Sequence, residues 1–104
     1  MSRLETLRRI AAQRPTDPFP RYGLAMELKQ QGQLEEAVVA FRELKEAIAD
    51  YVPQYLMHGQ LLAQLGRIEE AKQVMEQGVV VAGQKGDGHA SSELKGALAD
   101  LESM

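Results

Sequence analysis

The first informative feature of the sequence is what it uses sparingly. The 104 residues contain no cysteine, and only 5% of them are aromatic. The absence of cysteine excludes disulfides and thiol chemistry and fits a reducing compartment, so we expect a cytoplasmic protein. The net charge is -3, and no basic cluster is longer than Arg8-Arg9. A nucleic-acid partner is therefore not expected, because binding a phosphate backbone requires concentrated positive charge.

Segments that would direct the chain to a membrane are also lacking. The longest apolar run, from Val79 to Ala82, is far too short to cross a bilayer. The first ten residues, MSRLETLRRI, mix both charge signs and do not contain the apolar core of a secretory signal. We therefore expect a soluble protein without a membrane partner.

Groups that could carry out catalysis or bind a metal are scarce. The 2 histidines, His58 and His89, do not form the HxxxH or Cys/His spacing of a metal site. The segment 86–88 resembles one fragment of a calcium loop whose other ligands are missing. No glycine-rich phosphate loop follows a strand. We expect no catalytic residues, no metal and no cofactor, with His58 buried and His89 on the surface near a helix start.

What the sequence does contain is a nearly continuous series of helical segments. Good helix formers dominate, apolar residues recur at spacings of three and four, and no segment alternates like a half-buried strand. Prolines and glycines divide the segments, because both residue types interrupt helices. Gly78 lies inside one segment at a cost of about 1 kcal/mol relative to alanine, which close approach by the last helix would explain. The predicted helices span residues 3–14, 20–31, 34–50, 53–65, 68–84 and 89–101.

Two nearly identical phrases, GQLEEA at 32–37 and GRIEEA at 66–71, indicate an internal repeat. Shifting the chain by 34 positions also places Leu28 on Leu62 and Phe41 on Met75. Each unit reads as helix, turn and helix, and a fixed period of this kind is typical of a solenoid. The paired glutamates resemble catalytic acids, but they fall in the first turn of a helix, where carboxylates favour the positive end of the helix dipole.

The period and the residues at its main positions resemble the tetratricopeptide repeat family, in its small bacterial form. The family places a small residue midway along its first helix, glycine at the turn, alanine early in the second helix and a large residue one turn later. The matching residues are Ala25, Gly59, Gly32, Gly66, Ala37, Ala71, Phe41 and Met75. The resemblance implies an all-α fold, a short right-handed α-solenoid of antiparallel helix pairs.

The same alignment divides a single domain, 1–104, into four parts. Residues 1–17 correspond to a half repeat, 18–51 and 52–85 to two full repeats, and 86–104 to a capping helix. Roughly three repeats are needed for a stable stack, because one repeat cannot bury its apolar face alone. We expect the two flanking segments to supply the remainder.

The resemblance also implies a function, a non-catalytic protein–protein interaction module that works as an adaptor or scaffold. In this family the first helix of each repeat lines a concave groove, which would bind a peptide or protein segment. The positions that match are Phe19, Tyr22, Met26, Lys29, Gln30, Leu56, Gln60, Gln64 and Leu94. Exposed aromatic and methionine side chains suit a partner surface. The alternative is that the flanking helices cover these side chains, which would then belong to the core.

Other functions that the family suggests fit less well. Some members hold a partner's C-terminal carboxylates with a clamp of lysine, asparagine and arginine, but Tyr22, Met26 and Met57 stand at three of its positions. A second hypothesis is a self-associating homo-oligomer, because segment 3–14 lacks the first helix of its own repeat and Leu4 could meet another copy. An enzyme would need a well-ordered metal, or a deep pocket that holds His58 with a carboxylate.

Overall fold

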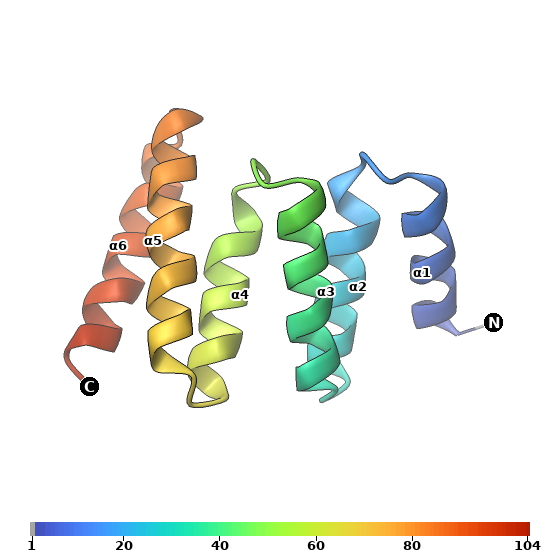
Figure 1. Ribbon diagram of the computed structural model, residues 1–104, viewed down its shortest axis with the longest axis horizontal. Coiled ribbons are helices and arrows are strands. Elements are labelled where there is room, and N and C mark those ends of the chain that lie inside the picture. Colours follow the sequence, from blue (N-terminus) through green and yellow to red (C-terminus); the bar gives the residue numbers. More distant parts are fainter. Residues whose placement is uncertain (1) are drawn as a thin grey trace. The chain divides into compact units, whose positions relative to one another are not determined.

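The computed structural model describes residues 2–104, and every regular element in that range is an α-helix. The chain divides into two compact units, an N-terminal unit that ends at Tyr51 and a C-terminal unit that begins at Val52. Each unit contains three helices (Figure 1). The helices are α1 (Arg3–Gln13), α2 (Pro18–Gln30), α3 (Leu34–Ala47), α4 (Pro53–Gln64), α5 (Ile68–Gln84) and α6 (Gly88–Glu102).

In the N-terminal unit, α2 packs against both α1 and α3 (Figure 1). The core residues Leu24 and Leu28 of α2 and Phe41 of α3 are fully or almost fully buried, as their spacing of three and four residues predicts. Arg3 Nε of α1 lies 2.6 Å from Glu27 Oε1 of α2, so an ion pair joins these two helices at the edge of the core.

In the C-terminal unit, α5 packs against α4 and α6, and α4 also contacts α6. Gly78 of α5 lies where these helices come closest. A Cβ atom at this position would be 2.5 Å from Tyr55 Cβ of α4 and 2.9 Å from Leu94 Cδ1 of α6. The expected close approach of the last helix is confirmed, and α4 comes closer still.

Local backbone chemistry explains most helix boundaries. Gly32 and Gly66 have φ of +80° and +81°, a left-handed conformation that glycine adopts without steric cost, so the predicted turns are confirmed. The side chain of Asp17 accepts a hydrogen bond from Phe19 N at 3.0 Å. This N-cap starts α2 at Pro18, two residues before the predicted start.

The prediction for the end of the third helix is wrong. Helix α3 ends at Ala47, whereas the sequence predicted a helix to residue 50. Ile48 leaves the helical region with φ of -142° and ψ of 74°, and its amide closes the last turn on Leu44 O at 2.7 Å. The remaining boundaries agree with the predictions to within one residue or coincide with them. In the part of the chain that the structure describes, no helix is long and apolar enough to span a bilayer.

Candidate partner-binding surface

The predicted binding residues of the first repeat form one stripe along α2. Phe19, Tyr22, Met26 and Lys29 follow one another at spacings of three and four, so their side chains share one face of the helix. Phe19 is 69% exposed, although its side chain is large and apolar. Tyr22, Met26 and Lys29 are half-buried, and the neighbouring Gln30 is exposed.

Edge-to-face ring contacts connect this stripe to the core. The Tyr22 ring centroid lies 6.3 Å from that of Phe41 and 5.3 Å from that of Tyr51, and the Phe19 centroid lies 6.1 Å from that of Tyr51. The interplanar angles are 69°, 66° and 87°, respectively. Each such contact contributes about 0.5–1.5 kcal/mol beyond burial. These four rings, the aromatic cluster, therefore hold the exposed Phe19 on a packed base.

The electrostatics of the cluster favour neutral hydroxyl groups. Burial raises the pKa of Tyr22 above its usual 10.0, and the charge of Tyr51 raises it further. Burial likewise raises the pKa of Tyr51. Both phenols are therefore protonated well beyond neutral pH, so each can donate a hydrogen bond while its ring offers an apolar face. Such a surface suits backbone carbonyl oxygens and apolar side chains of a polypeptide.

The predicted residues of the second repeat form a separate stripe on α4. Leu56, Gln60 and Gln64 follow one another at spacings of four and share one face of that helix. Leu56 is half-buried, whereas Gln60 and Gln64 are exposed. This stripe is more polar than the stripe on α2, and its amides can both donate and accept hydrogen bonds.

The expectation that Leu94 is available to a partner is wrong. Its side chain is only 1% exposed, because α6 packs against α5 where Gly78 provides no side chain. Conversely, Tyr51 was not predicted as part of the site, although it contacts two rings of the α2 stripe. The only sequence signal for it was an aromatic residue at the last position of the first full repeat, two positions before Pro53.

The two histidines considered for catalysis or metal binding lie where the sequence predicted them. His58 is buried, as predicted, with 2% of its surface exposed. His89 is exposed, and its Nε2 lies 3.2 Å from Glu93 Oε1 one turn along α6. Within residues 2–104, no group of three or more histidine, aspartate or glutamate side chains is arranged to hold a metal ion.

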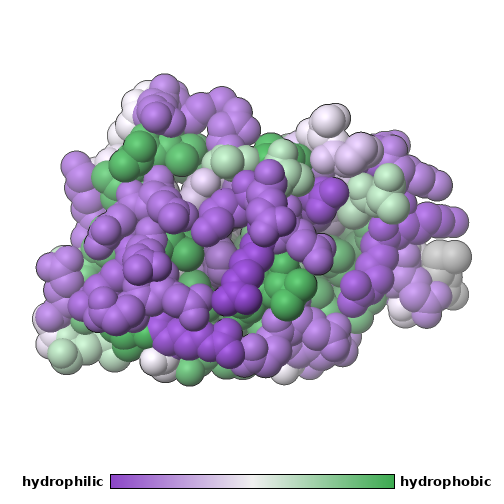
Figure 2. Space-filling view, in the orientation of Figure 1, coloured by the Kyte–Doolittle hydropathy of each residue, from purple (hydrophilic) through white to green (hydrophobic). Residues whose placement is uncertain are grey.

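The outer faces of the helices carry mostly polar residues. Figure 2 shows hydrophilic residues over most of the visible face, with hydrophobic atoms in the recesses between them. The large hydrophobic residues exposed in the described part of the chain are Phe19, Val39, Val80 and Met104. Only Phe19 among them stands beside other aromatic rings, which makes the aromatic cluster the strongest candidate for a partner-binding surface.

Comparisons with known proteins agree with the repeat architecture. A sequence model of the tetratricopeptide repeat family matches residues 21–51 and 55–79, which together exceed half of the chain. Among curated proteins, none matches the chain. A tetratricopeptide repeat domain protein from Salinibacter ruber, solved by NMR in solution, is 37% identical over 86% of this chain and 91% of its own, with a TM-score of 0.82.

Two more distant structures share the fold alone. PcrH, solved in complex with the chaperone binding region of PopD, is 12% identical over 96% of this chain and 76% of its own, with a TM-score of 0.86. SycD, a type III secretion translocator chaperone of Yersinia enterocolitica, is 14% identical over 95% of this chain and 69% of its own, with a TM-score of 0.83.

Proposed function

The chain belongs to the tetratricopeptide repeat family, a non-catalytic protein-interaction fold, and on that premise we propose that it binds an extended or helical segment of another protein through the stripe on α2, with the stripe on α4 as a separate contact surface of the C-terminal unit. The proposal includes the division into a half repeat (1–17), two repeats (18–51 and 52–85) and a capping helix (86–104). It also places the protein in the cytoplasm as an adaptor, a location that cell fractionation would test.

The observation that carries the proposal is the exposure of Phe19 on the aromatic cluster. Leaving a large aromatic side chain in water forfeits about 1.5–3 kcal/mol of burial free energy, which a partner recovers by covering it. Phe19 is held by the ring of Tyr51, so little side-chain entropy is lost on binding. Aromatic anchors of this kind, surrounded by polar groups, are typical binding hot spots.

The distant structural neighbours support the same interpretation. PcrH was solved in complex with the chaperone binding region of PopD, so one structure of this fold is bound to a segment of another protein, and SycD is named as a translocator chaperone. The surface on α2 has the chemistry for such a ligand, because it combines rings with phenol hydroxyls, a lysine and an amide. Of the predicted set, Phe19, Tyr22, Met26, Lys29, Gln30, Leu56, Gln60 and Gln64 remain accessible or partly accessible.

The test is a random-peptide selection against the wild-type protein, followed by titration of the selected peptides into variants. We expect Phe19→Ala to weaken binding by about tenfold or more, as loss of an aromatic anchor does. The Leu56→Ala variant tests separately whether the stripe on α4 contributes to peptide binding. Val80→Ala is the matched control, because Val80 is an exposed apolar residue of α5 outside both stripes.

Two results would contradict the proposal. Peptides that bind Phe19→Ala as tightly as wild type would show that the α2 stripe is not the binding surface. Peptides that lose affinity equally for Val80→Ala would indicate non-specific apolar binding. Phe19 is mostly exposed, so its replacement leaves the fold intact and a lost signal can be attributed to the surface.

Self-association through the terminal helices stays a prediction. Leu4, the residue through which it was expected, is half-buried in α1. Light scattering at high protein concentration tests the idea, and replacing Leu4 with serine should weaken any assembly that depends on this residue.

A further inference from the structure

A groove runs along the N-terminal unit between α1 and α3, with α2 as its floor. It contains a cavity of about 300 Å³ and a second of about 150 Å³, which share Arg8, Leu24, Ala40 and Glu43. Between the charged residues its lining is apolar and small, with Leu24 from α2, Ala11 and Ala12 from α1, and Ala40 from α3. We call it the α1–α3 groove; none of the residues that line it belongs to the binding stripe on α2.

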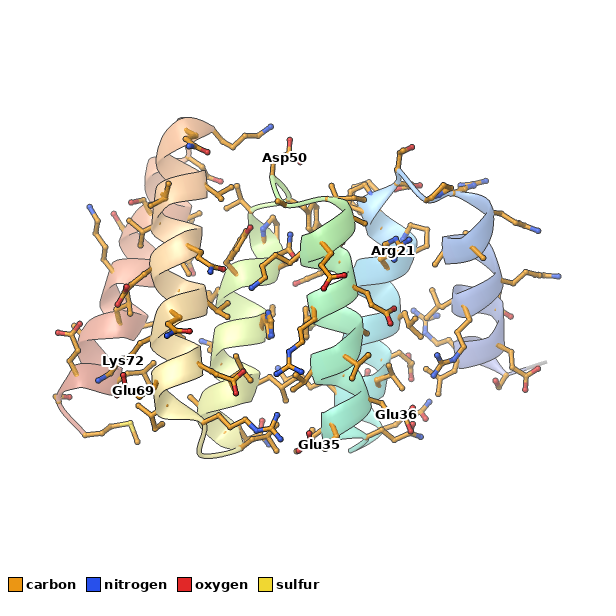
Figure 3. The ribbon with its side chains drawn as sticks, viewed as in Figure 1. Arg21, Glu35, Glu36, Asp50, Glu69 and Lys72 are labelled. Atoms are coloured by element: carbon orange, nitrogen blue, oxygen red, sulfur yellow. The ribbon has the colours of Figure 1, made fainter. Side chains whose placement is uncertain are left out.

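The two sides of the α1–α3 groove carry opposite charges. Arg8 of α1 and Arg21 of α2 contribute guanidinium groups, whereas Glu36 and Glu43 of α3 contribute carboxylates. Only one of the possible pairs is formed, between Arg8 Nη2 and Glu36 Oε2 at 3.5 Å, and both of its side chains are more than half exposed. Figure 3 shows Arg21 and Glu36 toward opposite ends of the unit, so charged groups occur toward both ends of the groove.

Arg21 has an unused donor in this groove. Its Nε atom is buried and has no hydrogen-bond partner among residues 2–104. A buried donor without an acceptor costs free energy, and the cost is larger when the group is charged. An added carboxylate in the cavity would remove this cost, because a guanidinium and a carboxylate form strong charge-assisted hydrogen bonds.

Helix α3 presents a ridge that complements the groove. Glu36, Val39 and Glu43 follow one another at spacings of three and four, so they form one acid–apolar–acid stripe about 10.5 Å long. Val39 is 49% exposed at the edge of the groove. One face of the unit therefore carries a basic side on α1 and an acidic side with an apolar centre on α3, with the groove between them.

From this self-complementary face, we propose that the α1–α3 groove is a homodimer interface in which α3 of each copy packs across the groove against α1 of the other. A two-fold axis places the same patch of both copies in contact. With the axis parallel to α3 and along the middle of the groove, Glu36 and Glu43 of one copy approach Arg8 and Arg21 of the other. Each Val39 then packs against the alanines of α1 in the other copy. An axis across the helices would instead place acid against acid, which is repulsive.

Oligomeric state measured by sedimentation over a range of protein concentrations tests the interface. We expect wild type to dimerise and Val39→Asp to weaken the dimer by about tenfold or more, because an unpaired carboxylate would enter the apolar contact with α1 of the other copy. Val80→Asp is the matched control and should dimerise like wild type, since Val80 is exposed on α5 in the other unit. A wild-type monomer at all concentrations, or equal effects of both variants, overturns the proposal.

Variants that reverse the charge of Arg8 or of Glu36 distinguish contacts between two copies from contacts within one chain. In Arg8→Glu alone or Glu36→Arg alone, every contact between these two positions across the homodimer becomes repulsive. In an equal mixture of the two variants, each contact again joins an acid to a base. We therefore expect monomers from each variant and a heterodimer from the mixture, whereas absence of rescue on mixing would refute the interface. Peptide binding through Phe19 is measured independently, so the two proposals can fail separately.

Discussion

Replacing Gly78 with alanine is the sharpest test of the packing in the C-terminal unit. In an ordinary helix interior this change is stabilising by about 1 kcal/mol, because glycine has the greater backbone freedom to lose. Here the new Cβ would lie 2.5 Å from Tyr55 Cβ and 2.9 Å from Leu94 Cδ1. Ordinary carbon–carbon contacts are about 3.5–4.0 Å, so α4 and α5 must separate by about 1 Å.

The steric cost is larger than the gain in helix propensity. Overpacking a core costs about 1–3 kcal/mol. The upper end applies because Tyr55 Cβ is attached to the backbone of α4 and cannot move aside as a flexible side-chain end can. Subtracting about 1 kcal/mol of propensity leaves a net loss of about 2 kcal/mol. For a domain of this size, that loss lowers Tm by about 8–16 °C.

Thermal and urea unfolding monitored by circular dichroism measure this effect. Gly83→Ala is the matched control on the same helix, because no heavy atom lies within 4 Å of the added Cβ. It should leave stability unchanged or increase it by up to about 1 kcal/mol. If Gly78→Ala proves as stable as Gly83→Ala, the close approach of α4 and α6 to α5 is wrong.

Three further predictions concern the turns, the caps and the tyrosines. Gly32→Ala should lower the free energy of unfolding by about 1–2 kcal/mol, and Gly32→Asn by less, because φ is +80° at this turn. Asp87→Ala should cost about 1 kcal/mol, since the Asp87 carboxylate accepts a hydrogen bond from Ala90 N at 3.0 Å, and Asp87→Asn should restore most of it in urea titrations. The raised pKa values of Tyr22 and Tyr51 provide stability that is complete below their unfolded value of 10.0 and is lost as pH rises through the folded values. Unfolding measured at increasing alkaline pH should therefore show a loss that Tyr22→Phe reduces, and an unchanged loss would contradict the burial of this phenol.

Much of the fold follows from local sequence rules. Apolar spacing predicts every helix, and glycine at 32 and 66 predicts two turns whose positive φ the structure confirms. The start of α2 was misplaced because Pro18 was assigned to the stretch that ends the first helix, and Pro20 was predicted as the first helical residue. Both fit in the first turn of a helix, where no backbone donor is required, and the Asp17 side chain caps it.

The candidate binding surface was only partly predictable. The period of 34 residues assigns Phe19 and Tyr22 to the first helix of a repeat, and their shared face follows from helix geometry. Tyr51 could not be assigned in this way, because it lies outside the regular helices. Leu94 was assigned to the surface because the last helix was aligned with the first helix of a repeat. In the structure the Leu94 side chain instead packs into the space left at Gly78.

By itself, the sequence determined the repeat, the order of the helices and the residues that turn the chain, because these depend on neighbours within a few positions. Only the tertiary structure decided which side chains of each helix remain exposed. Leu94 is buried, Phe19 is exposed on Tyr51, and the Nε of Arg21 is buried in the α1–α3 groove without an acceptor. Each of these outcomes depends on the distance between helices that are separated along the chain, and a local pattern of apolar residues does not specify that distance.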